Sequence, residues 1–295
     1  MGYLSTAKWI ARHPLCKNTF RCNLKYLHVK SYLFVFRHKK FKWIGNSLLL
    51  AHRAHSSVTI NAFAGLYEFQ EMGFLLHYLH RDDYFVDVGA NAGVYTVLAS
   101  KVIGCKSVSF EPSTLSYSAL LNNLRVNEIC DLVDHRKIAI GEESQAEVFI
   151  TTKKNSCNHV VEGEVDEKNA EKVEIDTLDH LCVGNNIVLK IDVEGFESKV
   201  LKGAVGLFET GRIDVVIAES NAAVIQSDPE FDIEEFMSRW GFFRIAYDPI
   251  SRKIARASRS NASGRNAIFL RDLKTASYRI KSAPKRSVHP LNQTI

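Results

Sequence analysis

Five carboxylates stand at or just beyond the ends of predicted strands, and they are the residues most suited to chemistry in this chain. They are Asp87, Glu111, Asp192, Glu194 and Glu219. In an open α/β sheet, ligands bind outside the carboxyl ends of the strands, so all five are expected at one edge of the sheet. Each one alone could be a loop acid or a helix cap. Together they favour a site for a ligand with hydroxyl or cationic groups.

A turn rich in small residues follows the strand that we predict at residues 84–88, and it contains Gly89, Asn91 and Gly93. Apolar residues then recur at helical spacing, and strand, glycine turn and helix form the first half of a nucleotide-binding βαβ unit. A dinucleotide site needs G-x-G-x-x-G facing a pyrophosphate, which the carboxylate of Asp87 would repel. The pattern therefore favours S-adenosylmethionine, whose ammonium and sulfonium are cationic. An ordinary strand-to-helix turn of another α/β protein is the alternative.

The next strand, predicted at residues 106–110, ends in Glu111-Pro112-Ser113. A carboxylate at this point, about 20 residues past the glycine turn, is placed to accept hydrogen bonds from both ribose hydroxyls. We therefore predict that Glu111 binds the ribose of the cofactor, and that Ser113 lies beside it. Ala139, near the end of the third strand at residues 132–140, is also predicted to line the cofactor site.

Lys190 lies inside an apolar strand predicted at residues 186–191. A lone ammonium there is costly unless it is paired, and Asp192 projects to the same side of the strand two residues later. The sequence therefore predicts an ion pair between Lys190 and Asp192. We expect Asp192 to accept a proton from an acceptor hydroxyl or to orient it, with Lys190 as its catalytic neighbour and Glu194 binding a second hydroxyl or a backbone amide. Asp192 is also predicted to contact the cofactor.

Two further candidates lie away from these strand ends. Glu68 is on a helix predicted at residues 67–79 and could reach the cofactor ammonium, although a helix surface charge is the alternative. His159 lies in a polar stretch at residues 151–171, which we interpret as an insertion over the site. It is a second candidate base, although a histidine in a loop is more often only solvated.

The elements that must position these residues alternate between strands and helices, which predicts an α/β fold with a doubly wound, mostly parallel sheet. Further strands are expected at 32–36, 42–50 with a turn at Gly45-Asn46, 146–150, 172–175, 213–218, 242–247 and 267–270. Helices are expected after Ser113 or Thr114, at 196–201, and over a stretch whose N-cap is Asp228 and whose first residue is Pro229.

Charge is distributed unevenly along the 295 residues, although the net charge is only +5. Residues 1–67 contain eleven Lys and Arg and no acid, and residues 251–295 contain eleven Lys and Arg with Asp272 as the one acid. The middle of the chain is acidic. Basic ends of this kind can meet nucleic acid, an anionic membrane surface or the acidic middle itself.

No apolar run reaches the roughly 18 residues of a membrane span, and basic residues interrupt the N-terminus where a signal peptide would be apolar. The six cysteines show no metal-binding spacing, so we expect reduced thiols in a cytoplasmic protein, with peripheral membrane contact through the basic ends. No metal is expected. In the alternative, Asp192, Glu219 and Asn221 would bind Mg²⁺ through oxygen atoms.

Three stretches together resemble the FkbM-type methyltransferases. They are V-D-V-G-A-N-A-G at 86–93, L-K-I-D-V-E-G-F-E at 189–197 and V-L-K-G-A at 200–204. Tyr67-Glu68, Asn123, Asn127 and Asp176-Thr177-Leu178 fit the same pattern. The resemblance covers about residues 60–272, and D-V-E-G is its specific part.

The resemblance implies a Rossmann-like class I methyltransferase that uses S-adenosyl-L-methionine and O-methylates a sugar, a polysaccharide precursor or another small molecule. It divides the chain into a basic, aromatic-rich extension at 1–58, a methyltransferase domain at 59–272 and a basic tail at 273–295. A small-molecule or glycan acceptor is expected, without a specific nucleic acid. The alternative is an RNA-binding or RNA-modifying methyltransferase that uses the basic ends. The sequence indicates no oligomeric state.

Overall fold

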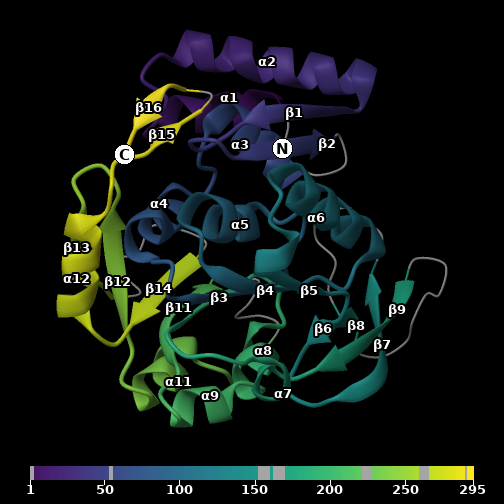
Figure 1. Cartoon of the computed structure of the whole chain (residues 1–295), viewed down its shortest axis with the longest axis vertical. Coiled ribbons are helices and arrows are strands. Elements are labelled where there is room, and N and C mark those ends of the chain that lie inside the picture. The colour runs from purple at the N-terminus through teal and green to yellow at the C-terminus, as the bar shows by residue number, and fades with distance from the viewer. Residues whose placement is uncertain are drawn as a thin grey trace.

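A large sheet crosses the middle of the molecule (Figure 1). The computed structural model describes residues 3–52, 56–151, 160–161, 170–220, 228–258, 266–289 and 291–295. Among these residues the large sheet has eight strands in the order β13-β12-β14-β11-β10-β3-β4-β5. The bounds are β3 Tyr84–Val88, β4 Lys106–Phe110, β5 Val133–Arg136, β10 Ile187–Ile191, β11 Ile213–Glu219, β12 Phe243–Asp248, β13 Lys253–Arg256 and β14 Asn266–Leu270.

The strands from β5 to β11 run parallel to one another, whereas β14, β12 and β13 pair antiparallel. The predicted α/β class with a mostly parallel sheet is therefore confirmed. The chain builds outward from β3 to β4 and β5, and then returns to place β10 on the other side of β3. The strand order therefore reverses between β3 and β10. In open α/β sheets, ligands bind at the carboxyl ends of the strands where the order reverses.

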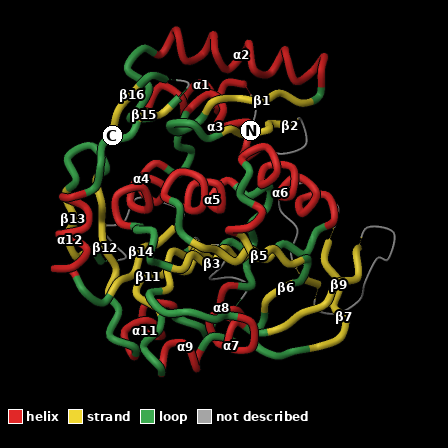
Figure 2. Tube along the Cα trace, in the orientation of Figure 1, coloured by secondary structure: helices red, strands yellow, loops and turns green. Residues whose placement is uncertain are grey.

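Helices cover both faces of the sheet (Figures 1 and 2). On one face lie α4 (Phe69–Tyr78), α5 (Val94–Val97) with its π-helical continuation at 98–103, and α6 (Thr114–Asn127). On the other lie α7 (Leu178–Leu181), α8 (Glu197–Lys202), α9 (Val205–Glu209) and α11 (Ile233–Arg239). Successive side chains of a strand point to opposite faces, so Val188 packs in the first core while Leu189 and Ile191 pack in the second.

A second, smaller sheet stands beside β5 and contains β6 (Ala139–Ile140), β7 (Gln145–Thr151), β8 (Val160–Val161) and β9 (Ala170–Asp176). The strand predicted at 132–140 is therefore wrong as a single element. Its first half is β5, but Ala139 and Ile140 pair with Ile175 and Asp176 of β9 instead of continuing along β4. The polar stretch at 151–171 is described only at its ends and at 160–161.

The N-terminal extension forms α1 (Tyr3–Arg12), α2 (Thr19–Phe36), a hairpin of β1 (His38–Lys42) and β2 (Leu48–His52), and α3 (Ser56–Ala64). The predicted turn at Gly45-Asn46 falls within the hairpin connection. The strand predicted at 32–36 is wrong, because these residues end α2. Tyr26, Val29 and Leu33 recur at helical spacing and are buried, so packing overrides the strand propensity of the aromatic run.

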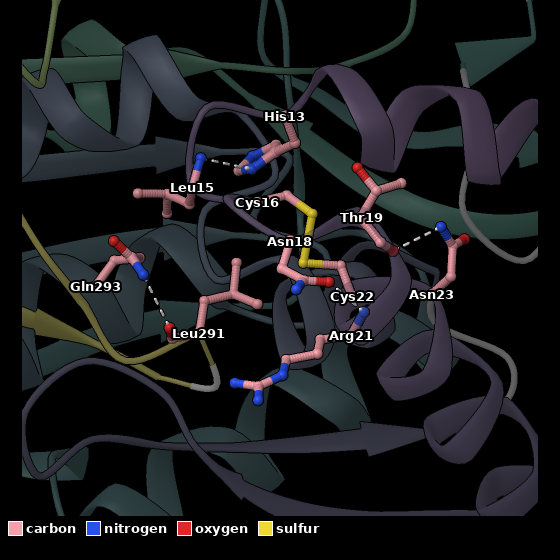
Figure 3. Close-up of a disulfide and its surroundings, with 10 residues drawn as sticks. All are labelled: His13, Leu15, Cys16, Asn18, Thr19, Arg21, Cys22, Asn23, Leu291 and Gln293. Atoms are coloured by element: carbon pink, nitrogen blue, oxygen red, sulfur yellow. Dashed lines mark hydrogen bonds between the residues drawn. A yellow bond between two sulfur atoms is a disulfide. The ribbon is translucent and has the colours of Figure 1, made fainter.

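A disulfide joins Cys16 to Cys22 across the connection between α1 and α2, with the two Cα atoms 6.3 Å apart (Figure 3). Asn18 caps α2 inside this loop, because its side chain accepts a hydrogen bond from the Arg21 amide at 3.0 Å. The expectation of reduced thiols is therefore wrong for this pair. The N-cap at Asn18 and the first turn of α2 bring Cys16 and Cys22 close together. The spacing of these cysteines in the sequence had indicated neither a disulfide nor a metal site.

The C-terminal residues form α12 (Leu273–Ser282), β15 (Ser287–Val288) and β16 (Gln293–Thr294). Ala276, Ile280 and Val288 belong to the same apolar core as Ile10 of α1 and Leu75 of α4, so both basic ends pack on the central domain. The predicted N-cap Asp228 is wrong, because α11 begins later and Asp232 accepts hydrogen bonds from its first amides.

Candidate active site

The turn after β3 is fixed by the neighbouring strand. The amides of Gly89 and Ala90 both donate to the Phe110 carbonyl at 3.0 Å, and the Asn91 amide donates to Glu111 Oε2 at 2.8 Å. Gly89 has φ +77°, and a Cβ there would lie 2.0 Å from the carbonyl oxygen of Asp192. The glycine is therefore required, because only a residue without a side chain lets the β3 turn approach the end of β10 so closely.

Glu111 is buried at the end of β4, and both of its carboxylate oxygens are held. Oε2 accepts the Asn91 amide, and Oε1 accepts the Ser113 amide at 3.0 Å. Burial raises the pKa of Glu111 to about 7, although the two amides favour the charged form. A carboxylate can accept about four hydrogen bonds, so both oxygens keep acceptor capacity for a ligand.

A cavity opens beside Glu111 at the carboxyl ends of β3, β4 and β10. Its polar lining includes Gly89, Asn91, Asp192 and Glu194, and its apolar lining includes Phe110, Ile138, Ala139, Ile140, Val193 and Phe196. Asn91 Oδ1 is buried there and has no hydrogen-bond partner among the described residues. This first cavity therefore combines apolar walls with a buried carboxylate and an unused acceptor.

Asp87 lies near the end of β3 with only 2% of its surface exposed. Thr96 Oγ1 donates to Asp87 Oδ2 at 2.6 Å and lies 2.8 Å from Ser109 Oγ. Burial raises the pKa of Asp87 to about 6, opposed by the Thr96 hydrogen bond and by the charge of Lys190. The carboxylate is thus fixed beneath the turn by a helix hydroxyl.

Lys190 and Asp192 form the predicted ion pair, with Nζ 3.2 Å from Oδ2. Lys190 is 1% exposed, and its ammonium lies 5.0 Å from the centre of the Tyr95 ring. Burial opposes the charge, but the carboxylates of Asp192, Glu68 and Asp87 raise the pKa of Lys190 above its ordinary value. Lys190 therefore anchors Asp192, whose side chain is 38% exposed and accessible to a ligand.

The backbone of the D-V-E-G loop after β10 is fixed by hydrogen bonds to the side chain of Glu197. Glu197 accepts the amides of Val193 at 3.1 Å and Gly195 at 3.0 Å, and burial raises its pKa to about 7. This backbone geometry gives Glu194 a φ of +52°. Oxygen atoms of Asp192, Glu194 and Glu219 lie within 4.8 Å of one another, so these three are the described residues that could hold Mg²⁺. Asn221 lies outside the described residues.

A second cavity adjoins the first and shares Gly89, Asn91 and Asp192 with it. Its lining adds Asp87, Lys190, Tyr95 and Glu68. Glu68 is clamped there, because Oε2 accepts the Tyr95 hydroxyl at 2.6 Å and Oε1 accepts the Asn266 amide at 2.7 Å. We call this the transfer cavity, since it contains the Lys190–Asp192 pair.

A third cavity shares Tyr67 and Glu68 with the transfer cavity. It lies between α1 and the start of α4, and it is lined by Trp9, Arg12, His13, Pro14, Phe69, Gln70, Glu71 and Asn266 as well. The Trp9 and Tyr67 rings lie 5.5 Å apart, centre to centre. Burial, with the negative charge of Glu68, raises the pKa of Glu71 to about 7. We call it the outer cavity.

The structure thus brings most of the predicted site residues together around the first two cavities. Ser113 is buried and donates its amide to Glu111, and Gly93 precedes α5 with φ +79°, but neither residue is among those that line the two cavities. His159 lies outside the described residues. Sequence reasoning missed Tyr95, Glu197 and, apart from Tyr67 and Glu68, the lining residues of the outer cavity. Glu197 could have been noticed because it ends the stretch at 189–197, and Tyr95 because it lies two residues after the glycine turn.

The family to which the chain belongs follows from comparison with known proteins. Residues 87–243, more than half of the chain, match the family described as Methyltransferase FkbM domain. No curated protein sequence matches the chain.

Among solved structures, an FkbM methyltransferase from Methylobacillus flagellatus is similar at 14% identity and a TM-score of 0.46, covering 75% of this chain and 55% of that one. This chain therefore spans about half the length of that protein. A SAM-dependent O-methyltransferase from Thermotoga maritima has 9% identity and a TM-score of 0.37, covering 68% and 63%. An rRNA methylase from Streptococcus thermophilus has 10% identity and a TM-score of 0.36, covering 68% and 93%. With the family match over the glycine turn, the Lys190–Asp192 pair and the D-V-E-G loop, the chain belongs to the FkbM methyltransferase family.

Proposed function

We propose that this protein transfers a methyl group from S-adenosylmethionine to a hydroxyl of a saccharide or another small hydroxylated molecule. The observation that carries the proposal is the junction of the first two cavities at Asp192. A buried carboxylate and a glycine turn lie on one side of it, and an anchored ion pair lies on the other. This is the arrangement that a nucleoside ligand and a separate acceptor would need.

The residues present fit the cofactor. Glu111 would accept the ribose hydroxyls, Asn91 Oδ1 would accept one further hydrogen bond, and the apolar wall at Phe110 would cover the adenine. Asp87 and Glu68 place negative charge around the transfer cavity, which suits an ammonium and a sulfonium. When bound, the cofactor supplies an electrophilic methyl group on sulfur.

Asp192 is the residue that would act on the acceptor. Its exposed carboxylate lies where the two cavities join, and the Lys190 ammonium fixes its position. It would accept the hydrogen bond of the acceptor hydroxyl and either take the proton or hold the oxygen in line with the methyl group. Positioning supplies much of the rate of such a displacement, and a general base adds about 10²–10⁴-fold. Glu194 would bind a second hydroxyl.

The outer cavity supports a small hydroxylated acceptor. Trp9 and Tyr67 offer aromatic faces for the C–H side of a sugar ring, and Glu68, Glu71 and Gln70 offer hydrogen-bonding groups for hydroxyls. Glu71, with a pKa of about 7, can both donate and accept near neutral pH.

Cofactor binding is tested by titration calorimetry with S-adenosylhomocysteine. Glu111→Ala should weaken binding by about 1.5–3 kcal/mol, because it removes hydrogen bonds to a charged acceptor. Glu128→Gln changes an exposed carboxylate at the end of α6 and should bind like the wild type. Heat with NAD but none with S-adenosylhomocysteine would contradict the proposal.

The chemistry is tested with tritiated S-adenosylmethionine, a panel of methyl glycosides and, separately, total cellular RNA. On an active glycoside, Asp192→Asn should keep cofactor affinity and lose at least about tenfold in turnover, since it removes the proton acceptor. Asp131→Asn is the exposed control. Label in RNA alone would favour the RNA-modifying alternative. Activity that EDTA abolishes and Mg²⁺ restores would assign Asp192, Glu194 and Glu219 to a metal instead.

A further inference from the structure

Helix α2 has a second apolar face whose side chains are largely exposed among the described residues of the chain. Phe20, Leu24, Leu27, Phe34 and Val35 all lie on this helix, and between 41% and 74% of each side chain is exposed. With Phe36, the last residue of the helix, they are six of the ten large hydrophobic side chains that are exposed among the described residues, so the concentration on one helix is not a random scatter. We call Phe20, Leu24, Leu27, Phe34 and Val35 the outer face of α2.

The helical repeat explains why the five residues form one surface. Positions 20, 24, 27 and 34 recur at steps of four, three and seven, and position 35 lies eleven residues after 24, so all five lie along one side of the helix. Cys22, Tyr26, Val29 and Leu33 are buried and lie on the opposite side. The helix is therefore apolar on two sides. The inner side packs in the apolar core of the protein, whereas the outer side is exposed and is suited to contact with a second molecule or surface.

The helix also has the position that such a contact requires. It lies along the outer edge of the molecule, beyond α1, α3 and β1 and far from the central sheet (Figures 1 and 2). The active-site cavities are lined by α1, α4 and the strand ends, so a partner on the outer face of α2 would leave them accessible.

The charges around this face are all of one sign. Arg21 and Lys30 flank the apolar stripe on the exposed surface of the helix, and Lys40 of β1 is exposed nearby in the sequence. Residues 1–67 contain no acid. A second copy of the chain placed against this face would bring the same positive charges together, which opposes self-association. An anionic surface would satisfy both the apolar stripe and the charges.

We propose that the outer face of α2 binds the surface of a membrane that contains anionic phospholipid. The apolar side chains would enter the boundary between headgroups and acyl chains, and the flanking Lys and Arg would contact phosphate groups, as interfacial helices do. The helix would lie in the plane of the membrane. No described helix is long and apolar enough to cross a bilayer.

The experiment is sedimentation of the whole protein, with its disulfide intact, in the presence of vesicles. One set contains phosphatidylcholine and phosphatidylglycerol at a ratio of about 3:1, and the other contains phosphatidylcholine alone, because anionic lipid supplies the charge term of the attraction. The wild type should sediment with the anionic vesicles. Raising the salt should weaken this binding, because salt screens the contribution of Lys and Arg.

The decisive variant is Leu27→Gln with Phe34→Gln, which removes two apolar contacts and no charge. Its partition into anionic vesicles should fall at least about tenfold, given the transfer free energy of two large side chains. The matched control is Tyr278→Gln, because Tyr278 of α12 is as exposed as Phe34, at 74%. Circular dichroism and thermal melting of each variant test whether it remains folded.

Two results would overturn the proposal. The first is equal sedimentation of the wild type and the Leu27/Phe34 variant with anionic vesicles, or no sedimentation of either. The second is self-association of the wild type in analytical ultracentrifugation that the same variant abolishes, which would assign the outer face of α2 to a second copy of the chain.

Discussion

Gly89→Ala is the most direct test of the close approach between the β3 turn and the end of β10. The new Cβ would lie 2.0 Å from the carbonyl oxygen of Asp192 and 3.3 Å from Val193 Cγ1. Atoms do not approach to 2.0 Å without a bond, so one backbone segment must move. The Asp192 amide donates to the Val88 carbonyl at 3.0 Å, and that movement would strain this hydrogen bond.

Two terms set the expected loss of stability. An alanine at positive φ costs about 1 kcal/mol, and overpacking of a close-packed site adds about 1–3 kcal/mol. Gly241→Ala is the matched control, because Gly241 has φ +78° against +77° for Gly89 and has nothing within 4 Å of the new Cβ. We expect a loss of about 1 kcal/mol for the control and about 2–4 kcal/mol for Gly89→Ala.

The assay is urea unfolding followed by circular dichroism, combined with calorimetry for S-adenosylhomocysteine. The affinity of Gly89→Ala should fall at least about tenfold, since Gly89 and Asp192 line both of the first two cavities. Gly241→Ala should bind like the wild type. Equal losses of stability in the two variants would show that the approach of the β3 turn to β10 leaves room for a Cβ at residue 89, which would contradict the steric requirement for glycine.

Three other predictions concern stability, each measured by urea unfolding. Burial and the charge of Glu68 raise the pKa of Glu71 from an ordinary value of 4.5 to about 7, so the folded state binds more protons between these values and stability falls as the pH rises. The free energy of unfolding should therefore fall by about 2 kcal/mol less in Glu71→Gln than in the wild type as the pH rises from about 5.5 to about 8. Arg279→Met should cost about 3 kcal/mol, because it leaves the buried Asp83 without its partner at 2.7 Å. Cys16→Ser should cost about 2 kcal/mol by freeing a short loop in the unfolded chain.

Each of these predictions has an internal comparison. An unchanged pH dependence in Glu71→Gln would remove that carboxyl from the titration. Lys281→Met removes an exposed cation from the same helix as Arg279 and should be nearly neutral, so equal losses would contradict the role of the ion pair. For the disulfide, a reducing agent should destabilise the wild type and leave Cys16→Ser unchanged.

The parts of the fold that local pattern determines could be predicted from the sequence. The strands at 84–88 and 106–110 match β3 and β4 residue for residue, because each is a short buried run that ends at small or turn-forming residues. The Lys190–Asp192 pair followed from the cost of an unpaired ammonium in an apolar strand. These predictions needed only neighbours within a few residues.

The parts that depend on distant contacts could not be predicted. The chain leaves the central sheet after β5 because β9 pairs with residues 139–140, and the sequence near those residues does not indicate this. The aromatic run at 32–36 favoured a strand until the burial of Tyr26 and Leu33 showed a helix. Likewise, Trp9 enters the outer cavity only because α1 packs beside α4.

The pairing of the two ends of the chain bears on how the protein is made. The Gly45 amide donates to the Ser287 carbonyl at 3.1 Å, and Ile44 forms a β-bridge with Val288. On the ribosome, residues 44 and 45 emerge long before 287 and 288, so the extension cannot reach its final packing while the central domain is being synthesised. The contact between residues 44–45 and 287–288 therefore forms only after the strands of the central sheet have been synthesised, and it closes the extension onto a sheet that is already complete.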